Sequence, residues 1–214
     1  MDNLLKLVGF RHSVYTRIAR MGLIEMDLQA EYIEANPFAS EPDPVLARLT
    51  PVGRVPVLGH GDFILTETAA ILRYLAALSG RRDLIPEDPR AMARMAQVVG
   101  VVDAYAYQPL VRQVFSQGFY QAYLGKAGDP EIVARGLALS EAPLNALENI
   151  ADEGLQLNGG YVSLADLHLA PMIEYFVRVP AADALLRRYP ALSTWWAQMQ
   201  SYPPLVQTDP LPLR

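Results

Sequence analysis

The feature that most constrains the fold is a change of pattern near residues 79–90. Before it, short apolar runs typical of strands alternate with helical patterns, whereas the patterned segments after it have helical spacing. The segment SGRRDLIPEDPR between the two parts holds two prolines and several charged residues, a composition typical of a linker. The sequence therefore predicts a small α/β domain over residues 1–80, a linker over 81–89 and an all-helical domain over 90–214.

The first domain is predicted to begin with a strand, a helix and a second strand. LLKLVGF reads as a buried strand, and VYTRIARMGL follows as a helix that we expect to end with Gly22 as its C-cap. The second strand is expected over Leu23–Gln29. This order of elements predicts a parallel pair with a right-handed crossover.

The next segment predicts a hairpin followed directly by a helix. VPVL and FILT flank the turn sequence GHGD, which is typical of an antiparallel pair. The following helix carries Ile71, Leu72, Leu75 and Leu78 on one side, and a short helix is expected near Val45–Leu49. The fold class is thus α+β, with a mixed four-stranded sheet, helices on its faces and a separate helical bundle.

Two signals organise the helical domain. Pro109 is expected to kink or end the long helix that starts near residue 90, because proline lacks an N–H donor. Ser163 and Asp166 have the spacing of a capping box, in which each side chain bonds the other residue's backbone N–H.

Composition excludes several classes of function. The net charge is −5 and basic runs are only two residues long, which argues against a nucleic-acid partner. The sequence shows no secretory signal and no apolar run of the roughly 20 residues that a membrane span needs, so a cytoplasmic protein is expected. The chain has no cysteine, which excludes disulfides, thiolate zinc sites and a thiol nucleophile of its own. Its three histidines lie far apart, and we expect no metal site.

Three short segments could carry chemistry. Val55-Pro56 opens a strand, and either it is an ordinary edge strand or Val55 pairs its backbone with an extended peptide. Glu67 and Thr68 stand at the start of a helix. Either Thr66 caps that helix and Glu67 favours its dipole, or the helix start and Thr68 hold a carboxylate while Glu67 takes an ammonium group.

Ser13 lies between the first strand and the first helix. It can cap the helix, or its hydroxyl can face a ligand at the end of the strand. His12 lies beside it, but no third member of a triad or G-x-S-x-G elbow accompanies the pair, so a hydrolase is not favoured.

Together these segments resemble the cytosolic glutathione S-transferase superfamily, in its bacterial-type, serine-using, theta-like form. GRVPVL followed by GDFILTETAAILRYL is similar to the family's glutathione-site signature, and SLADLHLAP to its C-terminal capping box. The resemblance implies a thioredoxin-like first domain, glutathione as co-substrate, a homodimer and no metal.

The resemblance also assigns roles to residues of this chain. Ser13 in SVYTR matches the family's S-x-x-x-R serine, which activates the thiol of glutathione, with Tyr15 as the alternative. Val55 would pair with the cysteinyl part of glutathione, Pro56 would be cis, and Glu67 and Thr68 would hold the γ-glutamyl end. Arg54 would lie near the glycyl carboxylate, and Asp103 would reach glutathione bound to the partner subunit.

The helical domain would hold the second substrate, a small hydrophobic electrophile. Candidate lining residues are Tyr105, Tyr107, Arg112 and Phe115, although these aromatic residues can equally be core of the bundle. The alternative function is a non-catalytic binding or assembly module of the same family.

Overall fold

The computed structural model describes residues 4–41 and 43–211, and the chain divides into two compact units. The first unit ends at Arg82 and is joined again from Val206 onward, while the second runs from Asp83 to Leu205. The last part of the chain thus belongs with the first unit and not with the helical one.

The first unit is built on one four-stranded sheet. Its strands are β1 (Leu5–Gly9), β2 (Ala30–Glu34), β3 (Val57–His60) and β4 (Phe63–Leu65), in the order β2-β1-β3-β4. β1 is parallel to β2 and antiparallel to β3, and β3 is antiparallel to β4. The predicted mixed sheet is confirmed.

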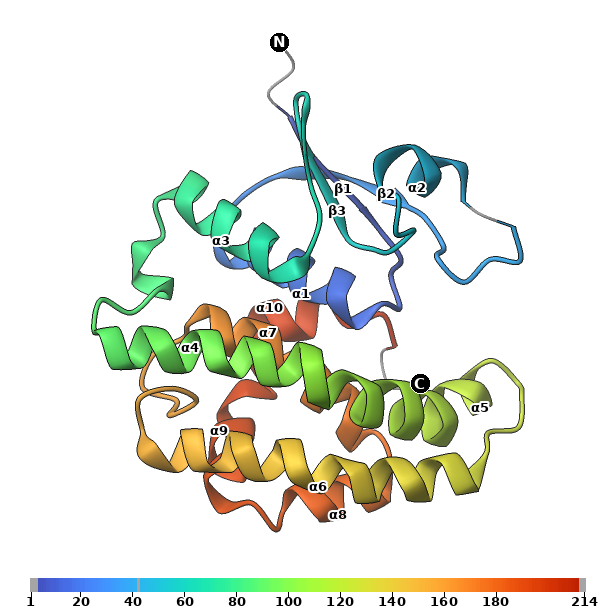
Figure 1. The fold of residues 1–214 in the computed structure, drawn as a ribbon, viewed down its shortest axis with the longest axis vertical. Helices are drawn as coiled ribbons and strands as arrows, with labels where there is room; N and C mark the ends of the chain where they lie inside the picture. The colour runs from blue at the N-terminus through green and yellow to red at the C-terminus, as the bar shows by residue number, and fades with distance from the viewer. Residues whose placement is uncertain (1–3, 42, 212–214) are drawn as a thin grey trace. The chain divides into compact units, whose positions relative to one another are not determined.

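Helices cover both faces of this sheet. α1 (Val14–Glu25) and α3 (Thr68–Ser79) pack against each other on one face, and α2 (Pro44–Leu49) covers the other (Figure 1). Under α2, the buried side chains of Val8, Ala35, Leu46 and Val57 form an apolar cluster. Successive side chains of a strand point to opposite faces, so β1 can contribute apolar side chains to both covered faces of the sheet.

The first helix is longer than predicted, and the second strand comes later. Gly22 does not end α1; a Cβ there would lie only 2.4 Å from Leu72 Cδ2, so a larger residue would displace the Leu72 side chain of α3. The helix continues to Glu25 with Leu23 buried. The strand expected over Leu23–Gln29 was therefore wrong, and β2 begins only at Ala30.

The start of α3 also differs from the prediction. Thr66 does not cap this helix, which begins at Thr68 with Glu67 at the N-cap position and no side-chain cap bond. Glu67 has a φ of 64°, a value that residues other than glycine adopt rarely. Leu78 is 43% exposed, so Ala76 takes its place in the buried stripe.

The second unit consists of helices. η1 (Arg82–Leu84) and α10 (Pro203–Gln207) stand where the chain passes from one unit to the other. Between them the chain forms α4 (Pro89–Val101), η2 (Val102–Tyr120), α5 (Gln121–Tyr123), α6 (Pro130–Glu153), α7 (Leu164–Val177), α8 (Pro180–Leu186) and α9 (Pro190–Met199). α6 packs along η2, and α7 contacts α4, η2, α8 and α9 (Figure 1). α7 is accordingly almost entirely buried.

Pro109 does not end the long helix. α4 continues directly into η2, a π-helical stretch with wider turns that includes Pro109 and runs on to Tyr120. The missing N–H of the proline removes one hydrogen bond, but burial of Pro109 and Leu110 in the bundle holds the chain helical.

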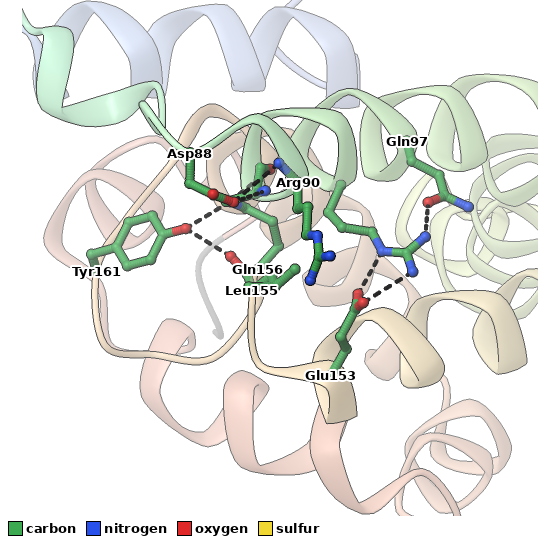
Figure 2. Close-up of polar contacts among 9 residues, drawn as sticks. Asp88, Arg90, Gln97, Glu153, Leu155, Gln156 and Tyr161 are labelled. Atoms are coloured by element: carbon green, nitrogen blue, oxygen red, sulfur yellow. Dashed lines mark hydrogen bonds and ion pairs between the residues drawn. The ribbon is translucent and has the colours of Figure 1, made fainter.

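Polar side chains tie the loop before α7 to the start of α4. Gln156 donates to Ala91 O at 3.2 Å and to Tyr161 Oη at 2.7 Å, while Tyr161 donates to Leu155 O at 2.7 Å (Figure 2). Nearby, the exposed Arg94 pairs with Glu153 (Figure 2).

The same network includes the capping box of α7. Ser163 and Asp166 make the reciprocal bonds, and Trp195 Nε1 donates to Asp166 Oδ1 at 2.8 Å. Ser163 Oγ also lies 2.6 Å from Gln156 Oε1. Burial raises the pKa of the Asp166 carboxyl, although hydrogen bonds from Ser163 and Trp195 oppose that shift. This region is a structural core made of polar groups.

Candidate functional site

The sheet topology brings three of the predicted segments to one end of the first unit. β1 ends beside the start of β3, because the two strands are antiparallel with Val8 opposite Val57. β4 ends beside the same point, since Leu58 lies opposite Leu65. Ser13 follows β1, Val55-Pro56 precedes β3, and Glu67-Thr68 follows β4. The three segments therefore share one edge of the sheet, although they are far apart in sequence.

Ser13 is held at this edge by a tight turn. Gly9 allows the turn, because a Cβ there would lie 2.3 Å from Thr16 Cγ2, and Phe10 N donates to Thr16 Oγ1 at 3.2 Å. Ser13 is the N-cap of α1, and its hydroxyl oxygen accepts from Thr16 N at 3.4 Å. Within residues 4–41 and 43–211, no hydrogen bond is donated by this hydroxyl. Capping thus uses the oxygen and leaves the proton for a ligand.

The neighbours of Ser13 are less suited to chemistry. His12 is half-buried against Phe10, with ring centroids 5.4 Å apart. Burial and the positive charge of Arg11 lower the pKa of His12, so its ring is neutral at pH 7. Tyr15 is half-buried in the first turn of α1.

Val55 presents an unused stretch of backbone. The peptide bond to Pro56 is cis, and Pro56 is buried while Val55 packs partly against the apolar cluster under α2. Among the described residues, neither the N–H nor the C=O of Val55 forms a hydrogen bond. Such a segment can add an extended peptide as a further strand.

At the start of α3, the negative charge of the Glu67 carboxylate lies beside the partial positive charge of the helix N-terminus, where Thr68 begins the helix. The Glu67 carboxylate is exposed and forms no ion pair or hydrogen bond within the described part of the chain. Thr68 is 6% exposed and begins α3, where the first backbone N–H groups have no partner inside the helix. The helix start favours an anionic group and the Glu67 carboxylate favours a cationic one.

The comparisons with known proteins fit this arrangement. A family model described as glutathione S-transferase, N-terminal domain, matches residues 7–83. Glutathione S-transferase F14 of Arabidopsis thaliana is 31% identical over 167 residues, which are 76% of this chain and 65% of that protein. This match spans just under two thirds of the relative's length.

Two solved structures resemble the whole chain. Glutathione S-transferase III, in apo form, is 26% identical with a TM-score of 0.82 and covers 99% of this chain and 98% of its own. The chain is thus similar to glutathione S-transferases in sequence and, over its whole length, in structure. A theta class glutathione S-transferase from Xanthomonas axonopodis pv. citri, solved with glutathione bound, shares the fold at 24% identity, with a TM-score of 0.77 and 97% coverage of each chain.

The family signature residues of the first unit thus lie at one edge of the sheet, with the cis bond that the resemblance implied. Arg54 is exposed next to this segment and forms no ion pair within residues 4–41 and 43–211. Arg17, the arginine of the S-x-x-x-R pattern, is buried and donates to Thr208 Oγ1 at 3.4 Å. Arg17 is therefore part of the core below the site.

Asp103 lies in the second unit, in a pair that the sequence did not show. Its Oδ1 lies 2.8 Å from Nε2 of His168, which is fully buried, while the Asp103 side chain is 41% exposed. The two residues are 65 positions apart, and only the packing of η2 on α7 brings them together.

The other candidates of the second unit differ in exposure. Tyr105 is 67% exposed, Arg112 is exposed and Tyr107 is half-buried. Phe115 is 4% exposed and stacks on Tyr175 at a centroid distance of 4.2 Å. The ring of Phe115 thus packs as bundle core, whereas the other three keep surface that a substrate can reach.

Sequence reasoning missed Thr16, His168 and Gln156. A signal exists for Thr16, since it stands where the first turn of a helix meets a glycine-ended strand. In the part of the chain that the structure describes, no group of three or more His, Cys, Asp or Glu side chains could hold a metal. No helix of that part is long and apolar enough to cross a membrane.

Proposed function

We propose that this chain is a glutathione transferase that uses the Ser13 hydroxyl to stabilise the thiolate of glutathione for attack on an apolar or aromatic electrophile. The observation that carries the proposal is the set of unused polar groups at one sheet edge. These are the Ser13 O–H, the Val55 backbone and the Glu67 carboxylate. A tripeptide with a thiol in its middle and a zwitterionic end matches these groups one by one.

The binding roles follow from the local chemistry. Val55 pairs through its backbone with the cysteinyl part of glutathione, and cis-Pro56 fixes the direction of that backbone. The Thr68 hydroxyl and the start of α3 take the γ-glutamyl carboxylate, while Glu67 takes the ammonium group beside it. Arg54 takes the glycyl carboxylate.

The chemical role of Ser13 is to lower the pKa of the bound thiol. A free thiol has a pKa of about 8.5, so little of it is thiolate at neutral pH. A hydroxyl that donates a hydrogen bond to sulfur favours the anion, and a tenfold gain in the thiolate-to-thiol ratio requires about 1.4 kcal/mol of such stabilisation. The thiolate then forms a C–S bond to the electrophile, and the leaving group departs with the bonding electron pair.

The electrophile is proposed to contact Tyr105, Tyr107 and Arg112 of η2. Two aromatic rings with accessible surface suit an apolar or aromatic compound, and the Arg112 guanidinium suits an anionic substituent. Phe115 supports this surface from the core, where it stacks on Tyr175.

We further propose a cytoplasmic homodimer, as the resemblance to the cytosolic superfamily implies. Asp103 then receives the γ-glutamyl ammonium of glutathione bound to the partner subunit. His168 Nε2, 2.8 Å from Oδ1 of Asp103, helps to hold this carboxylate in place. Light scattering behind size exclusion tests the dimer, and a monomer at assay concentration would remove this role of Asp103.

The test of the function is a glutathione-dependent activity screen across classes of electrophile, followed by two matched variants. Ser13→Ala is expected to lower kcat tenfold or more while the Kd for glutathione changes less than about twofold. Tyr15→Phe serves as the control and should turn over normally. Loss of turnover in Tyr15→Phe alone would move the role to Tyr15, and glutathione binding without turnover in every class would make the chain a binding module.

A further inference from the structure

The first unit contains a pocket away from Ser13. It has a volume of about 380 Å³ and lies where the second half of α1 and the turn after it meet the edge strand β2. Leu7, Leu23, Ile24 and Leu28 supply apolar walls, and Gln29 and Gln207 contribute polar side chains. Sites for small molecules commonly measure about 300–1,000 Å³ and combine apolar walls with polar groups that orient the ligand.

The cationic side chain of Arg20 also lines the pocket. The Arg20 guanidinium lies over the Tyr32 ring, 5.6 Å from its centroid, and both residues line the pocket. Within the described part of the chain, Arg20 forms no ion pair and no hydrogen bond. Its N–H groups can therefore bind a ligand.

The Tyr32 ring is fixed from its other end. Tyr32 Oη donates to Glu34 Oε2 at 2.8 Å, and Glu34 Oε1 accepts from Arg11 N at 3.2 Å. Glu34 is thus engaged in the turn before α1. Burial and the bond to Glu34 raise the pKa of Tyr32, so the ring stays neutral.

The positive charge of Arg20 and the negative charge of Asp27 together favour a ligand with a single negative charge. Asp27 also lines the pocket, but it is exposed on the turn after α1 and makes no ion pair with Arg20. A dianion would bring its second charge toward this carboxylate.

We propose that this pocket binds a small planar aromatic monocarboxylate at a site separate from the glutathione site. The carboxylate accepts from the Arg20 N–H groups, and the ring covers Ile24 and Tyr32, which are now 39% and 37% exposed. Arg20 follows Ser13 by seven residues on α1, or about 10 Å along the helix axis, so a ligand here does not occupy the position of the thiol.

The probe pair is 2-naphthoate and its neutral analogue 2-naphthamide, titrated into the ¹⁵N-labelled full-length protein with excess glutathione. We expect 2-naphthoate to shift the amide signals of Ile24, Leu28 and Tyr32 and to bind more tightly than 2-naphthamide. Arg20→Met should weaken 2-naphthoate at least tenfold and abolish the preference for it. The matched control Arg112→Met removes the same charge from η2 and should leave these shifts unchanged.

A filling variant tests the location independently. Ala30 lines the pocket, so Ala30→Leu should reduce binding of both compounds. Absence of shifts at millimolar 2-naphthoate, shifts only outside α1 and β2, or equal affinity in Arg20→Met would overturn the proposal. Failure of the glutathione mechanism is distinguishable, because Ser13→Ala should leave naphthoate binding intact and Arg20→Met should leave glutathione turnover intact.

Discussion

Two polar regions of this molecule look alike in sequence but differ in whether their polar groups form hydrogen bonds within the protein. Both TET at residues 66–68 and SLAD at residues 163–166 resemble helix starts with an acid beside a hydroxyl. In the second region each polar group bonds another part of the protein, from Ser163 and Asp166 to Trp195. In the first, the Glu67 carboxylate and the Thr68 hydroxyl have no hydrogen-bond partner among the described residues.

The difference separates structure from binding. A buried polar group without a partner costs free energy, so folds normally satisfy such groups internally. A group that stays unsatisfied at the surface of a well-packed unit is available to a ligand. The strained φ of Glu67 points the same way, because strain of this kind persists mainly where function requires it.

The largest effect is expected in the region of Ser163, Asp166 and Trp195, whose polar groups are hydrogen-bonded within the protein. Asp166→Ala would leave the buried Trp195 Nε1–H and the Ser163 N–H without acceptors, at about 1–3 kcal/mol for each such group. We expect the free energy of unfolding to fall by roughly 3 kcal/mol in urea denaturation. The control Glu153→Ala cuts the exposed pair with Arg94 and should barely move the midpoint. Equal midpoints in the two variants would contradict a structural role for this network.

The next largest effect is expected at Glu67, whose carboxylate has no hydrogen-bond partner among the described residues. Glu67→Ala removes the carboxylate that we assign to the ammonium of glutathione, and the Kd for glutathione should rise about tenfold, or about 1.4 kcal/mol. Stability should stay within about 0.5 kcal/mol, because the side chain bonds nothing described in the fold. Asp62→Ala, an acid in the turn between β3 and β4, is the charge-matched control. An unchanged Kd in Glu67→Ala, measured by calorimetry, would contradict the assignment of Glu67 to the ammonium group of glutathione.

The smallest effect concerns His12, beside Ser13. Its pKa is lowered in the folded state, so the unfolded chain takes up a proton first as the pH falls through about 6.5. Stability should therefore decline from pH 7 to pH 5.5, and His12→Gln should make that decline shallower. Parallel pH profiles of wild type and variant in urea denaturation would show that burial of His12 carries no such penalty.

The sequence predicted three of the four strands in place, because alternation and turn residues are local signals, but it put the second strand too early in the chain. The hairpin of β3 and β4 and the short helix α2 appear where expected. Packing explains why Gly22 does not end α1 and why Pro109 does not end the long helix. Gly22 lies inside α1, where its lack of a side chain leaves room for Leu72 of α3, and Pro109 is buried in the bundle within a continuous helix.

The candidate site was predictable as a set of residues and not as a geometry. The pattern of hydroxyl, acid and proline indicated Ser13, Val55-Pro56 and Glu67-Thr68, but only the strand register shows that they share one edge. The pairing of Asp103 with His168 and the pocket at Arg20 and Tyr32 have no local signal, since each depends on residues that packing brings together.

The central claim is that the Ser13 hydroxyl stabilises the thiolate of bound glutathione. The direct measurement is the pKa of that thiol, read from the ultraviolet absorbance of the thiolate as the pH of the saturated complex is varied. In the wild type this pKa should lie clearly below the free thiol value of about 8.5, and Ser13→Ala should return it to that value. A Ser13→Ala complex that keeps the lowered pKa would contradict the account.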